Sequence, residues 1–225
     1  MTRRYTLACL DMAGTTISDE GIVEEAAAAA IAAEGLSPGT VAHAQALEIV
    51  RETMGQSKIA VFRRILGRDE RAAVRANAAF EVAYADRVHL GRVRPLPGAA
   101  EAITALRAAG VTVAFTTGFS AATQQSILDT LEWSGLADLA LTPGSGLRGR
   151  PSPDLVLHAA IRAGVNDVRE IIVAGDSMTD MRCGVASGAG LIAGVLGGAH
   201  TADQLTDAGA THLLDSVADL PGLLT

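Results

Sequence analysis

Four groups of residues have side chains or amides that could bind and transfer a phosphoryl group, and each lies where a predicted β-strand ends. They are Asp11, the pair Thr117 and Gly118, Arg150, and the pair Asp176 and Asp180. Three carboxylates at one site repel one another unless a divalent cation lies between them. Mg²⁺ prefers oxygen ligands and is commonly shared between carboxylates and a phosphate, whose other oxygens an arginine, a hydroxyl and backbone amides can hold. The alternative is that each aspartate is a helix N-cap or a loop acid, but their joint placement favours a Mg²⁺ and phosphate site.

The part of the chain after Gly98 alternates between helix and strand patterns. Strands are predicted at 111–116, 139–141, 171–174, 191–193 and 212–214, and helices at 99–109, 120–131, 153–163, 178–186 and 202–208, followed by a short final helix. Strands separated by helices of this length predict a parallel sheet that is covered on both faces. Ligands bind at the carboxyl ends of the strands in such sheets, which is where the candidate residues lie.

The region between the first strand and Arg92 has only helix-like patterns. Helices are predicted at 22–33, 38–52, 58–66 and 69–88, and residues 92–98 read as a stiff linker. The strand at Tyr5–Leu10 must join the later strands, because a lone strand has nothing to pair with. We therefore predict a three-layer, Rossmann-like α/β core of residues 1–17 and 93–225. A helical cap domain of residues 18–92 is inserted after its first strand.

Composition excludes several classes of protein. The chain has 225 residues, 49% of them hydrophobic, and a net charge of −7, which excludes a disordered, collagenous or disulfide-stapled protein and argues against nucleic acid as a partner. Cys9 and Cys183 lack metal-ligand spacing and are predicted to be buried. The first residues lack a signal-peptide pattern, and the apolar run Ala26–Ala33 is too short to span a membrane. We expect a cytoplasmic protein with no membrane partner.

The distribution of basic residues singles out Lys58. Of the 18 basic residues it is the only lysine, and it lies in the segment Met54-Gly-Gln-Ser-Lys58 at a predicted helix start. Arginine can hold a phosphate, but only lysine can lose a proton and attack a carbonyl carbon to form an imine. The alternative is a solvated residue in the first turn of a helix. We favour a functional Lys58, because a chain that otherwise uses arginine retains its one lysine here.

Four motifs in order along the chain resemble those of the haloacid dehalogenase superfamily. They are Asp11-Met-Ala-Gly-Thr15, Thr117-Gly118, Arg150-Pro151 and Gly175-Asp-Ser-Met-Thr-Asp180, and the resemblance extends over the whole chain. It implies that Asp11 is a nucleophile that becomes an aspartyl phosphate. It also implies that Mg²⁺ is held by Asp11, the carbonyl of Ala13, Asp176 and Asp180. Thr117 would bind phosphoryl oxygens, and Arg150 takes the place of the usual lysine or arginine.

One position in the first motif narrows the expected activity. Superfamily phosphatases usually carry a second aspartate where this chain has Ala13, and alanine cannot protonate a departing alkoxide. The Asp-x-Ala-Gly-Thr-Thr turn and the segment leading to Lys58 are similar to those of the phosphonoacetaldehyde hydrolase branch, in which the lysine forms a Schiff base. This resemblance implies hydrolysis of the C–P bond of phosphonoacetaldehyde or a related phosphonoaldehyde. Val61 and Phe119 depart from the branch, where a histidine and a tyrosine are expected.

Other activities remain open at this point. A phosphatase of the same fold could act on a small phosphate ester if the cap or the substrate supplied the acid. Haloacid dehalogenation needs no metal and leaves the Asp176 and Asp180 pair hard to explain, and a non-catalytic binding protein is the remaining class. The glycine pattern at 144–149 does not open a helix, so a dinucleotide site is not expected. The expected partner is a small organophosphorus substrate, with a homodimer as a candidate assembly.

Overall fold

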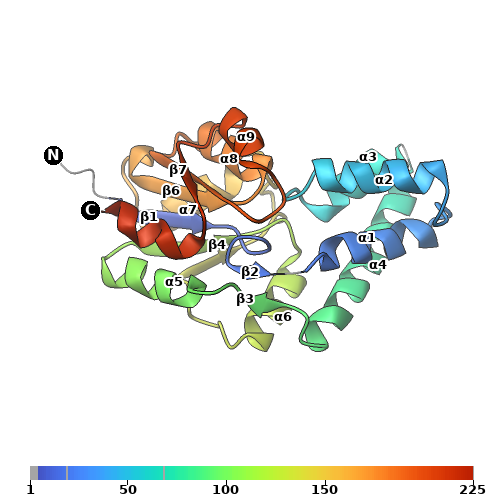
Figure 1. Ribbon diagram of the computed structural model, residues 1–225, viewed down its shortest axis with the longest axis horizontal. Helices are drawn as coiled ribbons and strands as arrows, with labels where there is room; N and C mark the ends of the chain where they lie inside the picture. Colours follow the sequence, from blue (N-terminus) through green and yellow to red (C-terminus); the bar gives the residue numbers. More distant parts are fainter. Residues whose placement is uncertain (1–4, 19, 68, 225) are drawn as a thin grey trace.

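The computed structural model describes residues 5–18, 20–67 and 69–224 and contains a six-stranded sheet (Figure 1). The strand order is β5-β4-β1-β6-β7-β8, and every neighbouring pair is parallel. The strands are β1 (Leu7–Leu10), β4 (Thr112–Thr116), β5 (Leu139–Leu141), β6 (Ile171–Gly175), β7 (Leu191–Val195) and β8 (His212–Leu214). The parallel α/β sheet predicted from the alternating pattern is therefore confirmed.

Helices cover both faces of the sheet. They are α5 (Ala99–Ala108), α6 (Ala121–Thr130), α7 (Asp154–Ala163), α8 (Met178–Ser187) and α9 (Ala202–Asp207), with the 3₁₀ segments η1 (Val168–Glu170) and η2 (Val217–Leu224). Strand β1 is buried on both sides: Ala8 and Leu10 pack in one apolar cluster, and Leu7 and Cys9 pack in another. A strand buried in this way has apolar residues at successive positions, which explains its sequence.

Four helices lie between β2 and β3 and form a group beside the sheet (Figure 1). These cap helices are α1 (Ile22–Ala33), α2 (Val41–Glu52), α3 (Lys58–Leu66) and α4 (Glu70–His89). Helix α1 packs against α2 and α4, and α3 packs against α4. Helix α2 begins three residues later than predicted because Thr40 is its N-cap, with its hydroxyl accepting the backbone N–H of His43. The domain boundaries proposed from the sequence remain a prediction.

The segment that we expected to be only a linker, residues 92–98, contains a short strand, so that expectation was incomplete. Strand β3 (Arg94–Pro95) pairs antiparallel with β2 (Ile17–Ser18), where the chain leaves the sheet for the cap helices. The Leu96 amide also donates a 3.0 Å hydrogen bond to the Thr16 carbonyl. The proline can belong to this strand because a two-stranded ribbon consists only of edges. The two segments that connect the sheet to the cap helices are therefore held side by side.

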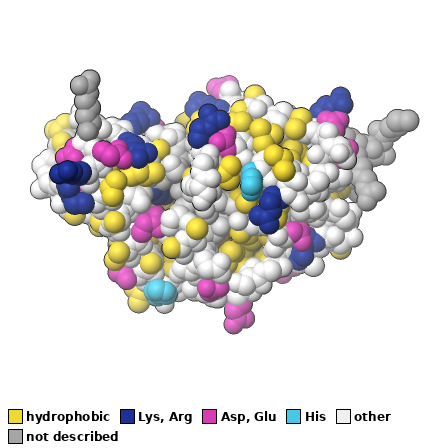
Figure 2. All heavy atoms as spheres, turned by 180° about the vertical axis from the view of Figure 1, so that it is seen from behind, with side chains coloured by type: hydrophobic (Ala, Val, Ile, Leu, Met, Phe, Trp, Pro, Cys, Tyr) yellow, Lys and Arg dark blue, Asp and Glu magenta, His cyan; other side chains and the backbone are white. Residues whose placement is uncertain are grey.

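The surface carries charges of both signs. Figure 2 shows basic and acidic side chains interspersed over the face opposite to the view of Figure 1. Exposed ion pairs include Arg63 with Glu70 and Arg107 with Asp138. Cys9 and Cys183 are buried and free, as predicted. Among the described residues, no helix is both long and apolar enough to cross a membrane.

Candidate active site

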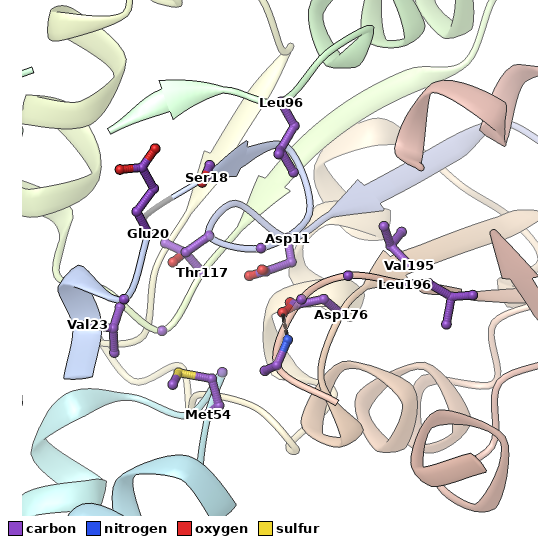
Figure 3. Close-up of a pocket in the computed structure, with 18 of the residues that line it drawn as sticks. Asp11, Ser18, Glu20, Val23, Met54, Leu96, Thr117, Asp176, Val195 and Leu196 are labelled. Atoms are coloured by element: carbon purple, nitrogen blue, oxygen red, sulfur yellow. Dashed lines mark hydrogen bonds between the residues drawn. The ribbon is translucent and has the colours of Figure 1, made fainter. Parts of the chain in front are cut away.

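The three predicted acidic residues meet at the carboxyl end of the sheet. Asp11 follows β1, Asp176 follows β6, and Asp180 lies in the first turn of α8. The Asp11 amide donates a 2.9 Å hydrogen bond to the Ala174 carbonyl, which extends the pairing of β1 and β6 up to the site. One carboxylate oxygen from each acid lies within 4.8 Å of the others, and all three side chains are buried. Figure 3 shows Asp11 and Asp176 with Thr117 around the same cavity.

Burial and mutual repulsion shift the proton affinities of these acids. Burial raises the pKa of Asp11 to about 6, with the Arg150 guanidinium opposing and the Asp180 carboxylate adding to that shift. Burial and the charges of Asp11 and Asp180 raise the pKa of Asp176 well above its usual range. Crowded, buried carboxylates of this kind are stabilised by a divalent cation, and an all-oxygen donor set suits Mg²⁺. The residues present therefore fit a metal site.

The turn after β1 explains why the first motif has a glycine at position 14 and a threonine at position 15. The Met12 carbonyl accepts the backbone N–H groups of Thr15 and Thr16 at 3.1 and 2.8 Å. This tight turn directs the Thr15 hydroxyl to an Asp176 carboxylate oxygen at 3.3 Å. Gly14 has φ +89°, and a Cβ there would lie 2.2 Å from the same carboxylate. Only glycine allows the turn to approach Asp176 so closely.

Asp180 has a structural role as well as a candidate metal role. Ser177 is the N-cap of α8, and its hydroxyl accepts the Asp180 amide while the Asp180 carboxylate accepts the Ser177 amide at 3.2 Å. This reciprocal pair is a capping box. Asp180 is therefore not the N-cap that the alternative considered, because Ser177 has that place, but its carboxylate does support the helix start from the third position of α8. The cap fixes the carboxylate at the helix start.

The predicted phosphate-binding residues line the same cavity. Thr117 and Gly118 follow β4, and the Thr117 hydroxyl accepts the backbone N–H of Phe119 at 3.3 Å. The Arg150 guanidinium lies 2.6 Å from an Asp11 oxygen and also contacts Asp180. These two carboxylates outweigh the effect of burial and raise the pKa of Arg150. The arginine expected to bind phosphate thus contacts the candidate nucleophile directly.

Lys58 lies in this cavity rather than in solvent. It is the first residue of α3 and is only 8% exposed. It lines a cavity of about 610 Å³ together with Asp11, Thr117 and Arg150. Its Nζ atom lies 5.6 Å from the ring centre of Phe80 and 5.4 Å from that of Phe119. The solvated alternative for Lys58 is therefore wrong.

The two positions that depart from the expected pattern lie in different surroundings. Phe119 lines the cavity and its ring faces Lys58. Val61 is buried in the apolar cluster that includes the cap helices. Ala13 also lines the cavity, and its methyl group supplies no acid. At these three positions the chain therefore has an apolar side chain in place of an acid or base.

Sequence reasoning assigned no role to the loop after β7, although residues 197–200 resemble a loop beside the site in this superfamily. The Ala199 amide donates a 2.7 Å hydrogen bond to an Asp176 carboxylate oxygen, as the dashed line in Figure 3 shows. A Cβ at Gly198 would lie 2.2 Å from that oxygen. The consecutive glycines Gly197 and Gly198 after a predicted strand were a signal for close backbone approach, but they did not identify the partner. The same reasoning also missed Phe80, which carries no local signal.

The proteins similar to this chain include a curated relative and two solved structures. The phosphonoacetaldehyde hydrolase of Bordetella pertussis is 29% identical over 154 residues, covering 58% of this chain and 56% of that protein. The alignment thus spans little more than half the length of that relative. The crystal structure of a phosphonoacetaldehyde hydrolase-like protein from Oleispira antarctica has a TM-score of 0.84 at 23% identity, covering 99% of this chain and 92% of that one. A hydrolase from Pseudomonas syringae has a TM-score of 0.82 at 25% identity, with 96% of each chain covered.

The match to a whole family covers most of the sequence. The family model described as a haloacid dehalogenase-like hydrolase matches residues 5–188. This range includes the first strand, the cap helices and all four motifs around Asp11, Thr117, Arg150 and Asp176. The chain therefore belongs to the haloacid dehalogenase-like hydrolases.

Proposed function

We propose that this hydrolase cleaves the C–P bond of phosphonoacetaldehyde or a related phosphonoaldehyde, giving an aldehyde and phosphate. The observation that carries the proposal is the position of Lys58. The one lysine of the chain is buried in the cavity that Asp11, Thr117 and Arg150 line. The likeness to phosphonoacetaldehyde hydrolases supports this substrate class.

The first half of the proposed reaction belongs to Lys58. Its neutral amine attacks the aldehyde carbon, and loss of water gives a protonated imine. The imine is β to phosphorus and can accept an electron pair. An alkyl carbon attached to phosphorus is otherwise a very poor leaving group, so the imine makes the later cleavage feasible. This role needs the lysine amine close to the phosphoryl group, and it is supported by the cavity that Lys58 lines together with Asp11, Thr117 and Arg150.

The second half of the reaction belongs to Asp11. A carboxylate oxygen of Asp11 attacks phosphorus, and the electron pair of the C–P bond moves into the imine to give an enamine. Water then hydrolyses the aspartyl phosphate and releases phosphate. The enamine takes up a proton, and hydrolysis of the resulting imine frees acetaldehyde and Lys58. Arg150 and Thr117 hold the phosphoryl oxygens during the transfer.

We assign a Mg²⁺ site to Asp11, the Ala13 carbonyl, Asp176 and Asp180. When bound, the ion would neutralise the carboxylates and balance negative charge on the phosphoryl oxygens. The residues around it hold the ligands in place. Thr15 and the Ala199 amide donate to Asp176, and the capping box fixes Asp180. Such partners orient metal ligands and tune their basicity.

Ala13 is consistent with the imine route. The electron pair from the broken bond enters the imine, so no acid at position 13 is needed to protonate a leaving alkoxide. A phosphate ester does need that acid. Phosphatase activity on a small phosphate ester is nevertheless our second candidate, because the cavity of about 610 Å³ has the size of an ordinary small-molecule site and the substrate could supply the acid.

A turnover assay separates the two candidates. The enzyme with Mg²⁺ is incubated with phosphonoacetaldehyde or with a panel of phosphate esters, and released phosphate is measured for the wild type and for Lys58→Arg. We expect phosphonoacetaldehyde turnover that Lys58→Arg abolishes. Ester turnover that survives Lys58→Arg, with no phosphate from phosphonoacetaldehyde, would replace the first candidate by the second. Arginine keeps the positive charge but cannot form the imine.

A further inference from the structure

A cluster of polar side chains joins cap helix α4 to helix α6, which packs beside the sheet. Glu81 on α4 accepts a 2.5 Å hydrogen bond from the Ser120 hydroxyl and another from the Thr123 hydroxyl. Ser120 is the N-cap of α6 and also accepts the Thr123 amide at 3.2 Å. Thr123 is buried, and Glu81 and Ser120 are half-buried. One carboxylate therefore closes the first turn of α6 from across the interface.

The residues next to this contact are the two that flank Lys58. Phe80 precedes Glu81 on α4, and Phe119 precedes Ser120. Their rings lie 5.6 and 5.4 Å from the lysine Nζ atom. Tyr84 connects the two rings, with its ring centre 5.7 Å from that of Phe80 and 4.6 Å from that of Phe119. The hydrogen bonds of Glu81 thus tie together the two chain segments whose rings lie near the Lys58 amine.

We propose that Glu81 is a positioning residue for the Lys58 reaction. By holding α4 against the start of α6, it fixes the Phe80 and Phe119 rings beside the amine and keeps Lys58 near the phosphoryl site. The inference rests on the proposed function, because it concerns the imine-forming role of Lys58. Glu81 is not among the residues that line the cavity. Its contribution is therefore geometric, and reactions of this kind are sensitive to small displacements of the reacting groups.

Charge strengthens the contact. A carboxylate accepting from two hydroxyl groups makes charge-assisted hydrogen bonds, which are stronger than neutral ones. The start of a helix also favours a negative charge, because its free amides and dipole are positive there. Helices α4 and α6 pack directly on each other, so removing the carboxylate leaves two hydroxyl groups of an interface without that acceptor. The contact should therefore loosen when Glu81 is truncated.

The test measures how fast borohydride traps the lysine adduct with phosphonoacetaldehyde in the full-length enzyme, together with the dissociation constant of inorganic phosphate. We expect Glu81→Ala to lower the trapping rate at least tenfold, with phosphate affinity changed less than threefold. Glu81→Gln keeps an acceptor oxygen without the charge, and it should lower the trapping rate clearly less than Glu81→Ala does. Glu70→Ala is the matched control on the same helix, because Glu70 pairs with Arg63 within the cap helices.

A double-mutant cycle tests the specific partners. In a Ser120→Ala, Thr123→Val background, Glu81→Ala should lower the trapping rate less than twofold further. A Glu81→Ala enzyme that is folded by circular dichroism and trapped at the wild-type rate overturns this inference alone. A wild-type enzyme that neither forms the adduct nor releases phosphate overturns the proposed function, and the role of Glu81 with it. Equal losses in Glu81→Gln and Glu81→Ala, or an equal loss in phosphate affinity, would also contradict a positioning role.

Discussion

Gly118 lies directly against Gln56, so that a Cβ at position 118 would come within 2.3 Å of the Gln56 carbonyl oxygen. Gly118 belongs to the loop after β4, and Gln56 belongs to the segment that leads into α3 and Lys58. The two backbones meet at the cavity because glycine has no side chain at this point. Two residues earlier in the same segment, the Met54 carbonyl accepts a 2.8 Å hydrogen bond from the Thr179 hydroxyl. The segment that leads to Lys58 can thus lie close to the end of the sheet because the residues that it meets there have small side chains or none.

The Gly118→Ala variant should push this segment away from the sheet. The added methyl group meets backbone atoms, which cannot rotate aside, so Lys58 is displaced from the phosphoryl site. We expect kcat/KM for phosphonoacetaldehyde to fall at least about 100-fold, as for other misplacements of a reacting group. Gly222→Ala is the control, because no atom of the described residues lies within 4 Å of a Cβ there. Full activity of a folded Gly118→Ala enzyme would show that this contact is not needed for turnover.

The Ala13→Asp variant should add phosphate ester hydrolysis. Ala13 lines the cavity beside Asp11, and a carboxylic acid there could protonate a departing alkoxide. General acids of this kind contribute roughly 10²–10⁴-fold, and we expect at least about a tenfold gain with small phosphate esters. The Ala13→Asn variant has nearly the same shape but is a far weaker acid, so it is the control. An equal gain in both variants, or no gain in either, would contradict the claim that the missing acid at position 13 limits phosphate ester hydrolysis.

Mg²⁺ should stabilise the folded protein. Binding at ten times the dissociation constant contributes about 1.4 kcal/mol to the free energy of unfolding, which corresponds to a rise in Tm of about 3–6 °C. EDTA should abolish both the rise and the activity, and added Mg²⁺ should restore them. The Asp176→Asn variant should lose most of the rise, because it removes a charged oxygen from the buried triad. A Mg²⁺-dependent rise that persists unchanged in this variant would place the ion elsewhere.

The two cysteines should be inert in the native protein. Burial raises the pKa of the Cys183 thiol to about 12, so at pH 8 about one thiol in ten thousand is ionised. Burial raises the pKa of Cys9 as well. We expect the native enzyme to react with a disulfide reagent at pH 8 only over hours, and the denatured enzyme to give two thiols per chain at once. Complete reaction of the native enzyme within seconds would contradict the burial of these residues.

The sheet and the acidic triad could be predicted because their signals are local. Asp11 and Asp176 each follow a run of apolar residues, and the ends of parallel strands share one edge of the sheet. The position of Lys58 beside them was expected only from the resemblance and from its being the single lysine. The cap helices were predicted from periodicity, with starts and ends that agree within three residues.

The contacts between the cap helices and the sheet could not be predicted in the same way. Glu81 and Ser120 are 39 residues apart, and neither helix pattern says which faces will meet. Strand β3 was missed because two residues are too few for a recognisable alternation, and Arg94 and Pro95 favour no strand by themselves. The glycine at position 198 suggests that the backbone lies close to another group there. Only the fold shows that this group is Asp176.

The most direct test of the central claim is covalent trapping at Lys58. The enzyme with Mg²⁺ is incubated with phosphonoacetaldehyde and sodium borohydride, digested, and analysed by mass spectrometry. Reduction of the imine should leave a stable alkyl group on the peptide that contains Lys58, with loss of activity in proportion to labelling, and the Lys58→Arg enzyme should remain unlabelled. An unmodified Lys58 in an enzyme that still releases phosphate from phosphonoacetaldehyde would contradict the imine mechanism.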